Sequence, residues 1–156
     1  MQRVTVPNEV LLPQVEAMVA EGTSVTLRVK GNSMLPFIVG GRDSVVLQKA
    51  DSLHRGDIVL AQGADHRYVL HRIVRIAGSQ VTLMGDGNLQ GTEQCQAARI
   101  TAKAVSILRG GKHIACNSRT ERRKAMVWQR LLPVRRYLLA IYRRTELLHK
   151  YNYSDI

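Results

Sequence analysis

The sequence has few of the residues that mark a disulfide-bonded, metal-binding or membrane-spanning protein. Its 156 residues include 2 cysteines, Cys95 and Cys116, too few for a disulfide framework and without the neighbouring ligands of a zinc site. No window approaches the ~18 uninterrupted apolar residues of a spanning helix, and the N-terminus lacks the charged-then-apolar pattern of a signal region. We therefore expect free thiols, no metal and no cofactor. We also expect a location in the cytoplasm or at the cytoplasmic face of a membrane, with no transmembrane segment or signal peptide.

Acidic residues are scarce as well, with 12 Asp and Glu against 23 Lys and Arg, for a formal net charge of +11. The excess is uneven along the chain. Residues 1–118 carry 13 basic and 9 acidic residues, a net of +4, whereas residues 119–156 carry 10 and 3, a net of +7. A basic tail of this kind attracts a membrane surface, a nucleic acid or an acidic partner. Charge alone names none of them.

The hydrophobic pattern predicts a mainly β fold with helices at both ends. The apolar residues within 8–21 follow helical spacing, and Gly22 is placed to end that helix; they are Leu11, Leu12, Val15, Met18 and Val19. From Ser24 the apolar period changes to two, which indicates a strand. Further strands are predicted at Ser44–Gln48, Asp57–Ala61, Tyr68–Ile76, Gln80–Met84 and Ile100–Leu108. Several short strands with few helices favour a twisted, largely antiparallel β-domain in the form of a partly closed barrel.

Beyond residue 118 the composition becomes helical and rich in arginine, so we divide the chain into a domain at 1–118 and a basic extension at 119–156. Pro133 is expected to split the extension into two helices. Two interpretations of these helices remain open. They either cover the β-domain with solvated arginines outward, or form a basic amphipathic surface with Trp128 and leucines at lipid headgroups.

Gly31-Asn32-Ser33-Met34-Leu35-Pro36 is the most informative segment. A serine between glycine and proline at a strand end, with a histidine from a later strand, is an arrangement that nucleophilic catalysis uses. That histidine is His71, in the predicted strand Tyr68–Ile76. Taken singly, a Gly-Asn-Ser turn is usually only a turn, and a strand histidine is usually a packed core residue. Together they make a serine peptidase the leading hypothesis.

A catalytic histidine needs a carboxylate to hold its tautomer. Asp86, in Gly85-Asp86-Gly87-Asn88, is the nearest acidic residue after His71 and is our candidate, with Glu93 as the alternative. Gly-Asp-Gly-Asn is also a turn signature, so Asp86 has a purely structural interpretation too.

In order along the chain, Gly31–Pro36, Gly41–Val46, Arg55–Val59, Leu70–Val74 and Gly85–Asn88 resemble the boxes of the signal peptidase superfamily, which includes LexA-type self-cleaving repressors. The resemblance spans about Ser24 to Leu108. The histidine at position 71 is similar to the archaeal and endoplasmic-reticulum signal peptidases, which pair serine with histidine, whereas bacterial and LexA-type members use lysine. No lysine lies between Lys49 and Lys103.

The resemblance implies that Ser33 is the nucleophile, His71 the general base and Asp86 the residue that orients it. The main-chain N–H of Ser33 would help to stabilise the oxyanion. Gly31, Asn32, Met34 and Pro36 would form the nucleophile turn, with Met34 packed beneath the serine and Pro36 fixing the bend. The expected activity is that of a signal-peptidase-type serine endopeptidase that matures an exported or leader-bearing peptide.

The chain departs from that pattern in three respects. The N-terminal membrane anchor typical of the family is replaced by the helix at 8–21, position 31 lacks the hydroxyl found in many bacterial members, and the basic extension has no counterpart.

The expected partners are a peptide or protein substrate and an anionic membrane surface bound through the basic extension. We do not expect nucleic acid, because a single helix precedes the serine domain. The alternatives are a non-catalytic binding module on the same fold and a LexA-type DNA-associated regulator.

Overall fold

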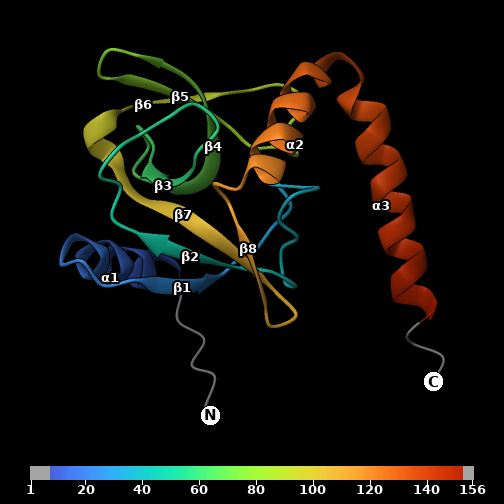
Figure 1. The fold of residues 1–156 in the computed structure, drawn as a ribbon, viewed down its shortest axis with the longest axis horizontal. Coiled ribbons are helices and arrows are strands. Elements are labelled where there is room, and N and C mark those ends of the chain that lie inside the picture. Colours follow the sequence, from blue (N-terminus) through green and yellow to red (C-terminus); the bar gives the residue numbers. More distant parts are fainter. Residues whose placement is uncertain (1–7, 153–156) are drawn as a thin grey trace.

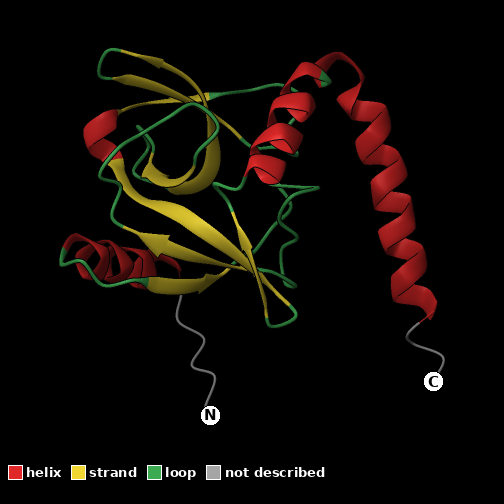
Figure 2. Ribbon diagram, viewed as in Figure 1, coloured by secondary structure: helices red, strands yellow, loops and turns green. Residues whose placement is uncertain are grey.

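The computed structural model describes residues 8–152, which form a curled antiparallel sheet with helices before and after it (Figure 1). Figure 2 shows the strands gathered in one body and the last helix extending away from it. The strands are β1 (Val25–Arg28), β2 (Ser44–Gln48), β3 (Ile58–Gln62), β4 (Tyr68–Ala77), β5 (Gln80–Met84), β6 (Glu93–Gln96), β7 (Ile100–Arg109) and β8 (Lys112–Ala115). The helices are α1 (Asn8–Ala20), α2 (Arg119–Arg130) and α3 (Arg135–Asn152), with 3-10 turns η1 (Ala97–Arg99) and η2 (Leu132–Val134).

The sheet has the strand order β1-β2-β7-β3-β4-β5-β6, and β8 pairs with β7. β3 lies in the middle, and its residues Ile58 to Ala61 are all buried. Because side chains alternate along a strand, Ile58 and Leu60 enter one apolar cluster and Val59 and Ala61 enter a second. The continuous apolar run of β3 is therefore explained by burial of both faces.

The first cluster lies between α1 and the β1, β2 and β7 part of the sheet. Leu12, Val15 and Val19 are buried in it and Leu11 packs partly against it, as their helical spacing predicts, whereas Met18 is 44% exposed. The second lies on the β3–β6 part, with Ile73, Val81 and Leu83 at its centre. A third, smaller cluster joins the β-domain to the basic C-terminal extension, residues 119–156. It contains Leu35 from the serine segment together with Trp128 of α2 and Leu139 of α3.

The predicted mainly β fold with terminal helices is confirmed. Pro133 separates α2 from α3, as predicted, by forming part of η2. Two strands, β6 and β8, were not predicted. The β6 sequence Glu-Gln-Cys-Gln has a single apolar residue, Cys95, which is buried opposite Val81 of β5, so its alternation is hardly visible in the sequence.

Within residues 8–152, none of the helices combines the length and the apolar character needed to span a bilayer.

Candidate active site

Ser33 lies on a turn that follows β1 and is fixed from below by buried side chains. Ser33 itself is exposed, whereas the next residue, Met34, is 2% exposed and belongs to the first core cluster. The turn is closed by main-chain hydrogen bonds from Leu35 N–H to Asn32 O (3.3 Å) and from Ile38 N–H to Met34 O (3.0 Å). Gly31 enters the turn with a φ of 77°, a conformation that favours glycine. The serine is thus held at the surface by an anchored segment.

The Gly85-Asp86-Gly87 segment lies directly against this turn. Gly87 N–H donates to the Ser33 carbonyl oxygen at 2.8 Å. A Cβ at position 85 would lie 2.4 Å from that oxygen, and one at position 87 would lie 2.5 Å from the Asn32 carbonyl oxygen. Both glycines are therefore required by close approach of two main chains.

The Asp86 carboxylate is hydrogen-bonded to Arg72 in the structure, and not to His71. Arg72 Nε and Nη2 donate to the two Asp86 carboxylate oxygens at 2.8 and 2.7 Å, and both side chains are buried. Trp128 Nε1 donates to the Asp86 main-chain oxygen at 2.8 Å. Asp86 thus occupies a bidentate, buried ion pair that fixes the loop under Ser33. The expected contact with His71 is replaced by this pair.

His71 contacts Glu93, the alternative carboxylate, instead. The Nδ1 atom of His71 lies 2.6 Å from Glu93 Oε2, with the histidine side chain 7% exposed and the glutamate 39%. A carboxylate offers only acceptors, so the proton of a neutral imidazole is placed on Nδ1 and Nε2 is left as the free acceptor. This is the tautomer that a general base requires.

Strand pairing explains why Glu93 reaches His71. Ile73 pairs with Leu83 of β5, and Leu83 pairs with Glu93 of β6, so these three residues share one face of the sheet. His71 lies two residues before Ile73 and shares that face. Glu93 therefore approaches His71 across β5, and this contact depends on β6, which was not predicted.

The same pairing relates His71 to the serine turn. Arg72 pairs with Met84, so the next positions along these antiparallel strands are His71 and Gly85. The Ser33 carbonyl oxygen packs on the side-chain position of Gly85. The Ser33 main chain consequently lies over the strand position beside His71. Within residues 8–152, the Ser33 hydroxyl and main-chain N–H make no hydrogen bond to another residue.

The C-terminal helices take part in this region through Trp128 and Arg135. Arg135 donates from Nη1 to the Asn88 main-chain oxygen (3.0 Å) and from Nη2 to the Trp128 main-chain oxygen (3.2 Å). Its guanidinium lies 5.2 Å from the centre of the Trp128 ring. Burial lowers the pKa of Arg135, although the nearby Asp86 carboxylate opposes that shift. The structure thus puts Trp128 in the interior, not at an exposed face.

The two thiols and Lys103 are poor candidates for the catalytic groups. Burial raises the pKa of the Cys116 thiol to about 11, and burial together with Glu93 raises that of Cys95, so both thiols are protonated near neutral pH. The Nζ of Lys103 is bound to the Ser52 main-chain oxygen at 3.1 Å. Within the described part of the chain, no group of three or more His, Cys, Asp or Glu residues could hold a metal ion.

One comparison with known proteins identifies the family. The family model described as Peptidase S24-like matches residues 2–108. That span contains α1, the serine turn, His71, Asp86, Glu93 and nearly all of β7, and it stops before β8 and the C-terminal helices. The match also agrees with the resemblance to the LexA and signal peptidase superfamily. The chain therefore belongs to the Peptidase S24-like family and has a fold of the serine-peptidase type.

Proposed function

We propose that this protein is a serine endopeptidase in which Ser33 attacks the peptide bond, His71 is the general base and Glu93 orients the histidine. The observation that carries the proposal is the 2.6 Å contact between His71 Nδ1 and Glu93 Oε2, because it leaves Nε2 available to accept the serine proton. The exposure of Ser33 supports the same assignment, since a nucleophile must be open to its substrate.

The reaction follows from these roles. The Ser33 Oγ forms a bond to the substrate carbonyl carbon while its proton passes to His71 Nε2. The resulting oxyanion is stabilised by main-chain N–H donors, for which Ser33 N–H is the candidate. His71 then gives its proton to the leaving amine as the peptide bond breaks, leaving an acyl-enzyme on Ser33. A water molecule then forms a bond to the acyl carbon while its proton passes to His71, and His71 returns that proton to Ser33 Oγ as the ester bond breaks and the acid product leaves.

Asp86 has a different part in this scheme. Its ion pair with Arg72 and its main-chain contact with Trp128 hold the Gly85–Asn88 loop, which supports the Ser33 turn through Gly87. We therefore propose Asp86 as a positioning residue, in place of the orienting role expected from the sequence. The signal-peptidase resemblance further leads us to propose an exported or leader-bearing peptide as the substrate.

Active-site labelling tests the proposal. Wild type, Ser33→Ala and His71→Ala are treated with a serine-reactive phosphonate, and the labelled residue is identified by mass spectrometry. We expect labelling at Ser33 that disappears in both variants, and a loss of peptide cleavage by about a factor of a million. Ser24→Ala and His113→Ala are matched controls at exposed positions and should label like wild type.

A folded wild-type protein that no phosphonate labels would contradict the proposal. Circular dichroism and thermal unfolding establish that each protein is folded. If the folded protein is not labelled, the non-catalytic binding module becomes the better hypothesis, because the fold would be present without a reactive serine.

A further inference from the structure

The outer side of α3 and the η2 turn before it combine exposed apolar and basic side chains. We propose that this surface, here called the α3 outer face, docks on an anionic lipid bilayer. Its apolar members are Leu132, Val134, Tyr137, Leu138 and Ile141, and its basic members are Arg136, which lies over the Tyr137 ring, and Arg144. The proposal is independent of the peptidase assignment, because none of these residues contacts Ser33, His71 or Glu93.

The apolar members are unusually concentrated. In the described residues 11 large apolar side chains are exposed, and 5 of them lie within residues 132–141. Tyr137 and Ile141 are 64% and 62% exposed. Single exposed apolar residues are ordinary on protein surfaces, whereas a contiguous group marks an interaction site.

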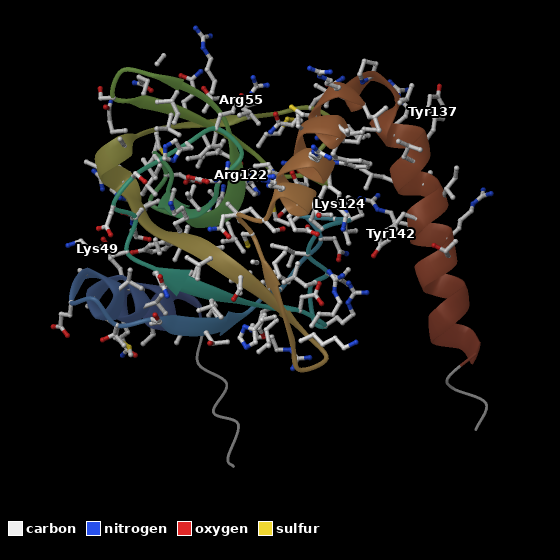
Figure 3. All side chains as sticks on the ribbon, viewed as in Figure 1. Lys49, Arg55, Arg122, Lys124, Tyr137 and Tyr142 are labelled. Atoms are coloured by element: carbon white, nitrogen blue, oxygen red, sulfur yellow. The ribbon has the colours of Figure 1, made fainter. Side chains whose placement is uncertain are left out.

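α3 packs on the rest of the molecule with its other side. Leu139 is buried against Leu35 and Trp128, and Tyr142 packs partly against the same cluster. At about 100° per residue, Tyr137 and Ile141 project opposite to Leu139. Figure 3 shows Tyr137 and Tyr142 extending to opposite sides of α3, and Figure 1 shows α3 extending away from the β-sheet. The outer face therefore has no covering element among the described residues.

The charge around the outer face has a single sign. From Arg130 to Thr145 the sequence contains five arginines and no Asp or Glu, and of these arginines only Arg135 is buried. An anionic surface is the complementary partner, with each arginine near it contributing about fivefold to binding. Long arginine side chains reach headgroups while their stems cover apolar surface.

The apolar content favours a bilayer over the other partners that arginines attract. Phosphates of a nucleic acid would engage the arginines but would leave Leu138 and Ile141 in water. A second copy of the chain would bring like charges together, since Arg136 and Arg144 lie beside the apolar group. In a bilayer the leucine and isoleucine side chains enter the acyl boundary and the tyrosine stays at the headgroup level. Trp128 is not part of this surface, because it is buried beside Asp86.

Vesicle co-sedimentation of the full chain tests the proposal. We expect binding to phosphatidylglycerol vesicles that weakens as salt is added, and much weaker binding to phosphatidylcholine vesicles. Ile141→Ser and Arg144→Gln should each reduce the partition coefficient about fivefold or more. Ile76→Ser and Arg75→Gln are matched controls, because both residues are exposed at the distant end of β4, and they should bind like wild type.

Three results would overturn the proposal. One is no sedimentation with anionic vesicles at low salt by a folded protein. Another is an equal loss of binding in the α3 variants and the β4 controls, which would show nonspecific attraction by net charge. The third is tight binding of duplex DNA that Arg144→Gln weakens and Ile141→Ser leaves unchanged, because it would assign the arginines to a nucleic acid.

Discussion

Two carboxylates adjoin the candidate catalytic pair, and the structure uses them differently. Asp86 is buried, with both oxygens bound by Arg72 and its main chain bound by Trp128. Glu93 is 39% exposed and contacts a single imidazole nitrogen. Asp86, the acidic residue nearest to His71 in the sequence, thus holds the Gly85–Asn88 loop. Glu93, which strand pairing places next to β5, is the one that contacts His71. Removal of one should cost stability, and removal of the other should cost catalysis.

The largest expected effect is the loss of activity when Glu93 is replaced. Glu93→Gln replaces an acceptor-only carboxylate by an amide that can also donate to Nδ1, which allows the wrong tautomer and removes the charge that stabilises the imidazolium. We therefore expect kcat to fall about a thousandfold. KM and the free energy of unfolding should change little, because the side chain is partly exposed. Steady-state peptide cleavage and urea unfolding measure the two quantities. Glu21→Gln, at an exposed position, is the control, and full activity of Glu93→Gln would remove Glu93 from the mechanism.

Asp86→Asn should give the opposite result, with stability as the main loss. It leaves the buried Arg72 guanidinium without its counter-charge, which typically costs about 4 kcal/mol. Urea unfolding measures the change, with the exposed Asp65→Asn as a control that should unfold like wild type. Residual activity of the folded fraction should stay above that of Glu93→Gln. A variant as stable as wild type but inactive would restore the orienting role to Asp86.

These two residues also show how far the sequence could predict the site. The serine turn, His71 and both candidate carboxylates could be named as candidates, because their residue types and order are visible in the chain. Which of the two carboxylates contacts His71 was not visible, since that depends on β6 pairing with β5. β6 has one apolar side chain, Cys95, and its pairing is decided by the neighbouring strand more than by its own sequence.

The C-terminal helices show the same limit. The predicted division at Pro133 was confirmed because proline acts locally on the chain. The position of Trp128 was not predictable in the same way. An indole N–H donating to the Asp86 main chain is a contact between segments about forty residues apart, and helix periodicity carries no information about it.

Asp43 extends the comparison to a second buried carboxylate bound by arginine. Burial raises its pKa, but hydrogen bonds from Arg109, Arg42 and the Val39 N–H outweigh that effect and lower it from 3.8 to about 2. The folded pKa lies below the unfolded one, so the stabilisation is present above about pH 4 and is lost as the pH falls toward 2. The shift corresponds to about 2 kcal/mol.

Urea unfolding between pH 7 and pH 2 measures this contribution. Wild type should lose stability over the acid part of that range, and Asp43→Asn should start lower and lose less. An identical pH dependence in the variant would show that other carboxylates carry the acid sensitivity.

The smallest expected effect tests whether the C-terminal helices position the loop beneath Ser33 or only cover it. Trp128→Phe keeps an aromatic ring beside Phe37 and Arg135 but leaves the Asp86 main-chain oxygen without its donor, which costs about 1 kcal/mol. Because the same loop donates Gly87 N–H to Ser33, its anchoring should be visible at that amide. We expect faster hydrogen exchange of Gly87 N–H and a modest fall in kcat, whereas Met126→Ala, at an exposed site on α2, should leave both unchanged. A loss of stability with unaltered Gly87 exchange and kcat would mean that Trp128 fills space and does not position the serine turn.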